Sequence, residues 1–328
     1  MIEILDGGYF SSIQDLGRVG WGQYGLPRSG AMDEFALRAA NRLSGNPDGS
    51  AGIEVGLGGI QFQALKNIQI AVCGWGLKVW VNGNEVGLWQ SVSLRKGQMV
   101  RIDRIGSGIW GVVAIQGGID VKPIMGSRST SLVGSFGGWH GRLLKQGDCL
   151  PIGHEPKRSD QVLERILPES ELTQYGRDEL CLRVVVGPHL DLLGEEVNRQ
   201  FFQQTYTVFP SSNRTGYRLQ GEPITMELKG DMISFGMLQG AIQIPPGGEP
   251  IVMMADAPTS GGYPVIAVVI RADLPLLAQA EPLKSRIRFK PVSVKVAREA
   301  YIEMLKKLDN IQEKDRLSEP WNWAGAIQ

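Results

Sequence analysis

The chain has 328 residues, 42% of them hydrophobic, so it can build the cores of two ordinary domains without disulfides or a structural metal. Lysine plus arginine equals aspartate plus glutamate at 34 each, which excludes an overall electrostatic field that would attract nucleic acid or an anionic membrane. No run approaches the roughly 18 apolar residues of a membrane-spanning helix, and the N-terminus MIEILDGGYF has no secretory signal pattern, so we expect a cytoplasmic protein.

The stretch from Ser12 to Asp33, SIQDLGRVGWGQYGLPRSGAMD, is the most specific part of the chain. Ordering such a glycine-rich loop costs conformational entropy, so the polar groups fixed in it predict one wall of a ligand site. A helix that begins near Asp33 would also direct backbone N–H groups toward an anionic group of the ligand. The polar side chains of this loop are Gln14, Asp15, Arg18, Arg28, Ser29 and Asp33.

Many short runs of branched apolar residues between glycines indicate a strand-rich first half. Asn82-Gly83 lies between strand-like residues, which predicts a hairpin with a type I′ turn. Strands this short and closely spaced favour a barrel or a sandwich over a parallel sheet. The runs cover residues 68–73, 77–81, 99–105 and 110–116.

Helices are expected to be few. The clearest covers residues 33–43, with Asp33 as its N-cap and Gly45 as its end. In the second half, residues 191–203 have a helical pattern. The apolar spacing after residue 296 predicts a surface amphipathic helix followed by a loose tail.

The chain is predicted to be mainly β with a few helices, in two domains. The polar, proline-containing segment 155–179 is poor in strand formers and is interpreted as the connection between them. Strands at 181–187 and 224–229 begin a second strand-rich region. The expected boundaries are 1–160 for the first domain, 161–295 for the second, and 296–328 for the C-terminal helix and tail.

Three further patterns do not indicate a redox, metal or dinucleotide site. Cys73, Cys149 and Cys181 lack C-x-x-C spacing and are interpreted as core thiols. The three histidines have no metal-ligand spacing, so no metal is expected. The segment Gly106–Gly111 fits G-x-G-x-x-G by letter, but it precedes a strand and not a helix, so a dinucleotide loop is not favoured.

Arginine and hydroxyl side chains gather between residues 127 and 142. Arg128 lies between Ser127 and Ser129, and Arg142 follows a short distance downstream. Guanidinium forks and hydroxyls match carboxylate, phosphate or carboxylated ureido groups. An alternative stays open, in which these arginines tie loops together by bonding backbone carbonyls.

A turn-and-strand segment in the second half is the next candidate. If Arg214 and Arg218 share one strand face, they flank Gly216, which would let a ligand approach the backbone. A surface ion-pair strip is the alternative. The substrate-binding residues expected here are Asn213, Arg214, Tyr217 and Arg218.

The segment TSGGYP, residues 259–264, combines hydroxyls, glycines and a phenol, which suit the lining of a pocket. Gln243 and Asp256 lie close to it in sequence and would add an amide and a carboxylate. The pocket residues expected from this part of the chain are Gln243, Thr259, Gly261, Gly262 and Tyr263.

Five ordered blocks resemble the biotin-dependent carboxyltransferase and allophanate hydrolase subunit 2 family. The first contains SIQDLGR and GLPRSGAMD, and the others cover residues 126–148, 211–221, 240–251 and 259–264. Together they span about residues 1–290, nearly the whole chain. The resemblance implies two cyclophilin-like β-barrel domains, which agrees with the strand pattern.

The resemblance implies chemistry on a urea-like or lactam N–C=O group. Family members move a carboxyl group from carboxybiotin, or open the lactam of 5-oxoproline with ATP. The chain ends soon after its last family block, with no biotin-carrier or biotin-carboxylase segment. We therefore expect a hydrolase component, the C subunit of an ATP-dependent 5-oxoprolinase, with ATP as co-substrate of the complex and an A subunit and a KipI-like B subunit as partners.

Two alternatives are kept. One is a biotin-dependent carboxyltransferase, which would bind biotin or a biotinylated carrier. The other is a KipA-like regulator that binds a KipI-like kinase inhibitor and has no chemistry of its own.

The implied site roles fall on the loops described above. Arg18, Arg128 and Arg214 would neutralise carboxylate or phosphoryl charge, and Asp15 or Asp33 would handle the lactam proton. Gln14 and Thr259 would orient the ring, while Ser29, Ser129 and Arg142 would contact the substrate. One departure from the family pattern, Ala257-Pro258 before the threonine, puts a family role for Asp256 in doubt.

Overall fold

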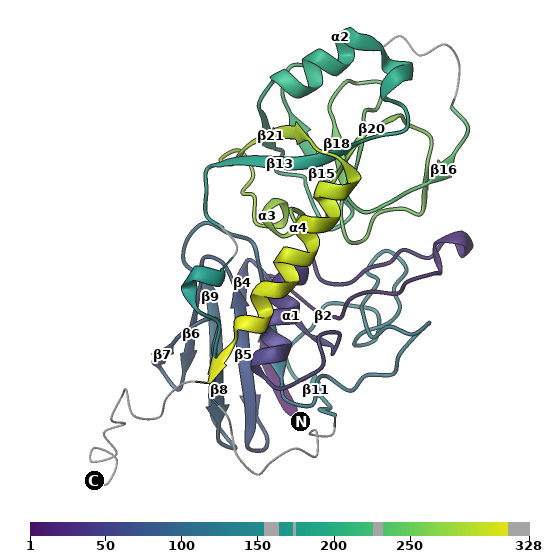
Figure 1. Cartoon of the computed structure of the whole chain (residues 1–328). Helices are drawn as coiled ribbons and strands as arrows, with labels where there is room; N and C mark the ends of the chain where they lie inside the picture. The colour runs from purple at the N-terminus through teal and green to yellow at the C-terminus, as the bar shows by residue number, and fades with distance from the viewer. Residues whose placement is uncertain (154–163, 173–174, 226–231, 314–328) are drawn as a thin grey trace.

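The computed structural model describes residues 1–153, 164–172, 175–225 and 232–313. Two lobes lie one above the other in Figure 1, with strands β1 to β11 in the lower lobe and β13 to β21 in the upper one. The fold is mainly β, as the sequence predicts.

The first lobe consists of two antiparallel sheets packed face to face. One has the order β11 (Cys149–Leu150), β1 (Ile2–Gly7), β4 (Gly58–Ala64), β9 (Met99–Arg104), β6 (Leu77–Val81) and β7 (Asn84–Val86). The other has the order β2 (Phe10–Gln14), β3 (Gly52–Gly56), β10 (Trp110–Ile115), β5 (Ile68–Gly74) and β8 (Ser91–Leu94). Alternating apolar side chains from both sheets, such as Phe62 and Ile53, fill the space between them.

The predicted hairpin is confirmed between β6 and β7. Val81 pairs with Asn84, and Asn82 and Gly83 have φ angles of 48° and 84°. Positive φ at both central positions is the requirement of a type I′ turn.

Helix α1 (Glu34–Leu43) covers the outer face of the second sheet, over β5 and β10. Both strands are therefore buried on two faces and read as continuous apolar runs. Small side chains such as Ala36, Ala40 and Ala114 at this contact allow the helix to approach the sheet closely. The helix predicted over residues 33–43 is confirmed.

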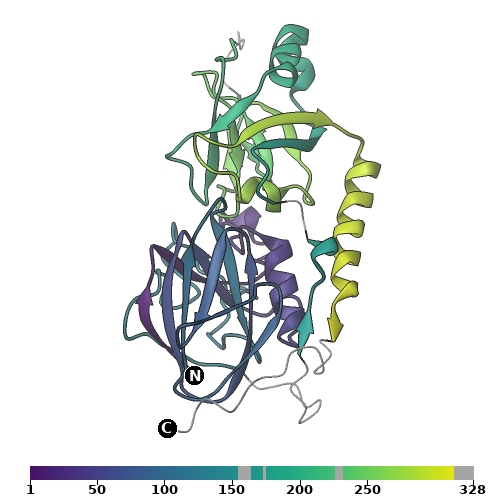
Figure 2. The ribbon, with the colours of Figure 1, turned by 90° about the vertical axis from the view of Figure 1, so that its left-hand side faces the viewer.

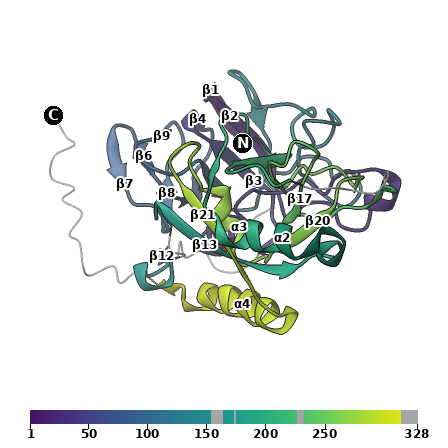
Figure 3. The same ribbon diagram turned by 90° about the horizontal axis from the view of Figure 1, so that it is seen from above.

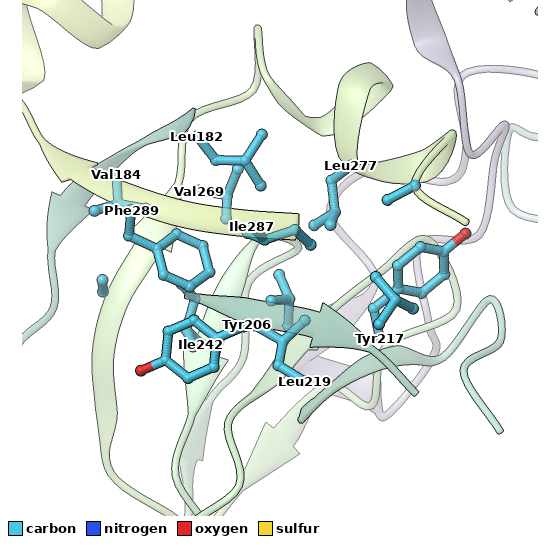
Figure 4. Close-up of a cluster of buried hydrophobic side chains, with 14 of the residues drawn as sticks. Leu182, Val184, Tyr206, Tyr217, Leu219, Ile242, Val269, Leu277, Ile287 and Phe289 are labelled. Carbon is cyan, nitrogen blue, oxygen red and sulfur yellow. The ribbon is translucent and has the colours of Figure 1, made fainter. Parts of the chain in front are cut away.

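The second lobe is a closed barrel. Its strands run in the order β13 (Glu179–Val186), β20 (Val265–Val269), β17 (Ala241–Gln243), β18 (Ile251–Met253), β15 (Gly216–Gln220), β14 (Tyr206–Val208) and β21 (Arg286–Pro291). Figure 4 shows its interior, where Phe289 and Tyr206 lie beside aliphatic side chains from the other strands. Helix α2 (Leu190–Gln203), predicted over 191–203, and the short helix α3 (Leu274–Ala278) pack against this barrel.

Helix α4 (Val294–Lys307) runs from the second lobe down along the outside of the first (Figures 2 and 3). Ala300 and Met304 are buried in the cluster that also holds the apolar side of α1. The pairs β12 (Arg165–Ile166) with β22 (Gln312–Glu313), and β16 (Phe235–Gly236) with β19 (Ser260–Gly261), are minor. Single helical turns η1 (Gly22–Tyr24), η2 (Glu169–Glu171) and η3 (Leu308–Asn310) complete the elements.

The lobes share a buried interface. Met32 and Trp110 of the first lobe belong to the core cluster of the second. The Trp110 indole Nε1 donates to the hydroxyl of Tyr217 at 3.1 Å, and Gln279 accepts from the backbone N–H of Trp110 at 3.0 Å. The relative position of the lobes is thus fixed by apolar packing and by buried hydrogen bonds.

Some sequence expectations need correction or cannot be placed. Cys73 is buried, but Cys149 is only half-buried and Cys181 is exposed. The reason is strand alternation in β13, which turns Leu180 and Leu182 inward and Cys181 outward. Most of the strand expected at 224–229 and the tail after 313 lie outside the described residues. Among the described residues, no helix has both the length and the hydropathy needed to cross a bilayer.

Candidate functional site

The base of the first loop is a close crossing of two chain segments. The Arg18 N–H donates to the carbonyl of Arg28 at 2.8 Å, and the Ala31 N–H donates to that of Asp15 at 3.0 Å. A Cβ atom on Gly17 would lie 2.6 Å from the carbonyl oxygen of Ser29, so only glycine fits there. Beyond the crossing, the loop with η1 projects from the lobe (Figure 1).

Asp15 joins this loop to the hydroxyl-rich segment. Its Oδ1 accepts from the hydroxyls of Ser127 at 2.7 Å and Ser129 at 2.5 Å and from the Gly17 N–H at 2.7 Å. Its Oδ2 accepts from the Arg128 N–H at 2.5 Å. With four donors on one carboxylate, Asp15 holds the two segments together, and this position does not support a role in moving the lactam proton.

Gln14 also fixes the loop. Its amide nitrogen donates to Ser12 Oγ at 2.9 Å and to the Thr130 carbonyl at 3.2 Å, while its oxygen accepts from the Gly30 N–H at 3.2 Å. The side chain is 1% exposed. Gln14 therefore supports the wall from behind, and the structure does not place it where it could orient a ring.

Arg18 lies under the loop with most of its donors unused. Its Nη2 donates to the Ser129 carbonyl at 2.6 Å, and its guanidinium lies 4.7 Å from the centre of the Phe136 ring. Nε and Nη1 are buried without a hydrogen-bond partner among the described residues. Burial lowers the Arg18 pKa, while the charges of Asp15 and Asp256 oppose that effect. Two nitrogens of the Arg18 guanidinium, Nε and Nη1, are therefore left without an acceptor in the described part of the chain.

Asp33 is the N-cap of α1 and is completely buried. It accepts from the Ala36 N–H at 2.9 Å, from the Tyr175 hydroxyl at 2.8 Å and from the Gln279 amide at 2.9 Å. Burial raises the Asp33 pKa to about 6, although these hydrogen bonds act in the opposite direction. The predicted cap is confirmed, but enclosure by the helix and by the second lobe corrects the expectation that Asp33 handles a substrate proton.

The Asp33 carboxyl predicts a pH dependence of stability. Its pKa is higher in the folded chain than its ordinary 3.8, so between about pH 4 and 6 the folded state binds more protons than the unfolded state. Stability from this group is therefore lost as pH rises through that window, by up to about 3 kcal/mol. In urea unfolding, Asp33→Asn, which cannot titrate at this position, should show a smaller fall than wild type. The fall that remains comes from other buried carboxyls such as Glu54, whose pKa burial raises to about 7.

The exposed Asp191 of α2 offers the matched control. Asp191→Asn should follow the wild-type pH curve. A constant difference between wild type and Asp33→Asn from pH 4 to 6 would contradict the assignment.

Arg214 links the lobes through a buried charged cluster. Its guanidinium donates to Glu54 of β3, to both oxygens of Asp256 at 2.8 and 3.2 Å, and to the Gly30 carbonyl at 2.7 Å. Burial acts to lower the Arg214 pKa, but the charges of Glu54 and Asp256 outweigh it and raise that pKa, so the guanidinium stays charged. Because the bonds of Arg214 are used inside the protein, it is a positioning residue and does not neutralise substrate charge directly.

A hollow lies between the lobes beside this cluster. The first loop and the start of α1 form one side, and Gln239, Arg271 and Leu274 of the second lobe form the other. Its polar lining is Asp15, Arg28, Ser29, Glu34, Gln239 and Arg271. Within the residues that the structure describes, no group of three or more side chains is arranged to hold a metal ion.

Arg128 and Arg142 form hydrogen bonds within their own loops. The Arg128 guanidinium donates to the Val121 carbonyl at 2.8 Å and to Asp120 at 3.0 Å, away from Arg18. Arg142 forms a bidentate pair with Asp148 at 2.7 and 2.8 Å. Burial opposes ionisation of Asp148, but hydrogen bonds led by that from Arg142 outweigh it and lower the Asp148 pKa to about 2. Both arginines therefore tie loops together, as in the alternative left open by the sequence. This corrects the expectation that they contact the substrate.

The residues expected to act together in the second lobe are separated, because Arg214 precedes β15 and is buried between the lobes, while alternation within β15 turns Tyr217 inward and Arg218 outward. Tyr217 is buried at the lobe interface, where its hydroxyl donates to the Ala278 carbonyl at 2.9 Å, and Arg218 points to solvent. Arg214 and Arg218 therefore do not flank a common ligand. Asn213 closes its own turn by accepting from the Thr215 N–H at 2.8 Å.

The expected pocket of TSGGY is a separate small cluster. The Gln243 amide donates to the Tyr263 carbonyl at 3.1 Å, and Gly261 pairs with Phe235 of β16. Gly262 and Tyr263 follow on the same turn, and Thr259 accepts a bond from the Met237 N–H through its carbonyl. None of these residues lines the hollow between the lobes.

Sequence reasoning missed Arg271, Glu34 and Gln239. Arg271 follows the apolar run VIAVVI, and a charged residue where a buried strand ends is the signal that would have marked it. Glu34 in the first helical turn reads as an ordinary helix start. Gln239 carries no signal in the sequence.

Comparison with known proteins places the chain in a family. The model of the carboxyltransferase domain, subdomain A and B, matches residues 24–291. The chain belongs to this family. It is 36% identical over 300 residues to the C subunit of 5-oxoprolinase from Escherichia coli K12, covering 92% of this chain and 94% of the relative. It is 33% identical to the protein of the same name from Haemophilus influenzae, covering 94% and 98%.

Solved structures agree with the family assignment. The crystal structure of the Kluyveromyces lactis urea amidolyase matches 97% of this chain with a TM-score of 0.88 and 31% identity. The chain corresponds to 20% of that longer protein. The fold described above is thus that of a carboxyltransferase domain that also occurs inside a much larger chain.

Proposed function

We propose that this chain acts as the C subunit of a multi-subunit 5-oxoprolinase. The observation that carries the proposal is the hollow between the lobes, walled by a loop of arginine, serine and carboxylate groups in a chain that matches two such C subunits over nearly their full lengths. The hollow contains no cysteine, and its one serine has no histidine beside it among the lining residues. Binding and polarising a substrate suit such a lining better than nucleophilic attack.

The proposed reaction uses ATP as co-substrate of the complex. The γ-phosphoryl group passes to the amide oxygen of 5-oxo-L-proline as its bond to ADP breaks. A first water molecule attacks the activated carbon and the ring C–N bond breaks, which leaves an acyl phosphate. A second water molecule then hydrolyses the acyl phosphate and releases phosphate. The products are L-glutamate, ADP and phosphate. In this scheme an A subunit and a KipI-like B subunit share the work. Arg18 is buried beside the loop and is not among the residues that line the hollow, so it is given no direct contact with the substrate.

Reconstitution tests the proposal. The chain is mixed with A-type and B-type subunits, 5-oxo-L-proline and ATP, and glutamate release is measured with each component omitted in turn. We expect release to require all three proteins and ATP. If release is unchanged without this chain, the proposal fails, and binding of the B subunit without an effect on turnover would favour a regulator.

The urea amidolyase match favours one second candidate, carboxyl transfer from carboxybiotin to an amide-type acceptor. This function predicts that a biotinylated carrier binds the chain. It also predicts carboxylation of urea by the chain with a biotin carboxylase, and no ATP-dependent release of glutamate from 5-oxo-L-proline.

A further inference from the structure

Two arginines, one from each lobe, line the hollow. Arg28 donates from Nη2 to the Leu16 carbonyl at 3.1 Å, and its buried Nε has no partner in the described part of the chain. Arg271 uses Nε and Nη2 on Glu34, at 2.7 and 2.9 Å. Its guanidinium also lies 4.6 Å from the centre of the Tyr301 ring. The two guanidiniums therefore line one hollow from opposite lobes.

The carboxylates at this wall are already engaged. Asp15 accepts four hydrogen bonds, as described above. Glu34 is shared between Arg271 and Arg38, and it also accepts from the Tyr301 hydroxyl of α4 at 2.8 Å. Burial lowers the Arg28 pKa, and so does the charge of Arg271, although the nearby Glu34 carboxylate acts in the opposite direction, so the two cations repel one another. An oxoanion between them would remove that repulsion.

Ser29 adds a hydroxyl, unpaired within the described residues, to the lining of the same hollow. Its side chain is 3% exposed and lines the hollow, and its Oγ has no partner among the residues described. The backbone holds it at a φ of 54°, which is uncommon for a residue other than glycine. The neighbouring Gly30 is fixed on both sides, by Gln14 at its N–H and by Arg214 at its carbonyl. A buried unpaired hydroxyl costs free energy, so its retention here points to a ligand.

We propose that Arg28, Ser29 and Arg271 form a seat for the carboxylate of the substrate, with one guanidinium supplied by each lobe. The identity of that substrate as 5-oxo-L-proline rests on the proposed function. In this seat Arg271 is held by Glu34, and Tyr301 supports Glu34 from α4. Substrate binding thereby depends on both lobes and on the helix that runs along them.

Arg28→Gln tests the seat with little risk to folding, because the Arg28 side chain makes one hydrogen bond to the protein. In the reconstituted complex, the variant should raise the KM for 5-oxo-L-proline about tenfold or more. Turnover of 2-pyrrolidinone, the same lactam without the carboxylate, should not change. Arg28→Lys, which keeps the charge and loses the fork, should give a smaller rise. The matched control is Arg101→Gln on β9, whose side chain is 57% exposed.

Binding to the chain alone separates this proposal from the proposed function. Calorimetric titrations with 5-oxo-L-proline, L-glutamate and inorganic phosphate are compared for wild type and Arg28→Gln. Carboxylate binding that Arg28→Gln abolishes supports the seat, even if the complex releases no glutamate. An unchanged KM and unchanged binding in Arg28→Gln would overturn the seat and leave the proposed function standing. Binding of phosphate and of neither carboxylate would overturn the assignment to a carboxylate.

Discussion

Replacing Arg214 by methionine is expected to lower the free energy of unfolding by about 3–5 kcal/mol. The side chain is 3% exposed, and it pairs with Glu54 of the first lobe and Asp256 of the second. Methionine fills similar space but leaves two carboxylates buried without their cation, which is the costly way to break a buried ion pair. Urea unfolding followed by tryptophan fluorescence measures the loss, and Trp110 at the lobe interface makes the signal sensitive to separation of the lobes.

Arg218→Met is the matched control, since Arg218 lies four residues away and is exposed. Its effect should stay within about 0.5 kcal/mol. The deficit of Arg214→Met should shrink at acidic pH, because protonation neutralises the unpaired carboxylates. Equal losses for the two variants, or a deficit that grows on acidification, would contradict the role given to Arg214.

Replacing Asp15 by alanine is expected to have the second largest effect, again about 3–5 kcal/mol, because four donors lose their acceptor. Three of these donors belong to the segment 127–129. Each buried donor left unsatisfied costs roughly 1–3 kcal/mol, reduced where a hydroxyl can turn to another acceptor. Urea unfolding gives the free energy, and protease cleavage within the first loop reports whether that wall has been released.

Two further variants serve as comparisons for Asp15→Ala. Asp15→Asn keeps an acceptor at Oδ1 and should lose less than the alanine variant. Asp6→Ala removes an exposed carboxylate that accepts only from the Gly8 N–H among the described residues, so it should cost no more than about 0.5 kcal/mol. A loss for Asp15→Ala no greater than that for Asp6→Ala would show that the network does not hold the loop.

Local signals in the sequence were sufficient for much of the fold. Asn82-Gly83 specifies a turn by the φ angles it tolerates, and Asp33 specifies a helix start by the acceptor it presents. Both act within a few residues, so they can be recognised without the rest of the chain. The prediction that Cys181 is a core thiol was wrong. The apolar run in which it lies suggests burial, but the alternation of side chains in β13 turns the thiol outward.

The candidate site could be predicted only in part. Some of the predicted polar residues line the hollow, whereas others form hydrogen bonds only within the protein. The loop of residues 12–33 contributes Arg28 and Ser29 to the hollow, as a wall of a ligand site should. Arg214 has the same chemistry as Arg28, and only the positions of Glu54 and Asp256, 160 and 42 residues away in sequence, show that its bonds are spent within the protein. Arg271 lies at the site because the second lobe packs against α1. No local sequence pattern indicates that packing.

The most direct test of the account is a crystal structure of the assembled complex with 5-oxo-L-proline. We expect the lactam in the hollow between the lobes, with its carboxylate about 2.7–3.2 Å from donors of Arg28 and Arg271. A ligand bound at a different surface of this chain, such as the groove beside Lys284 and Arg177, would contradict it.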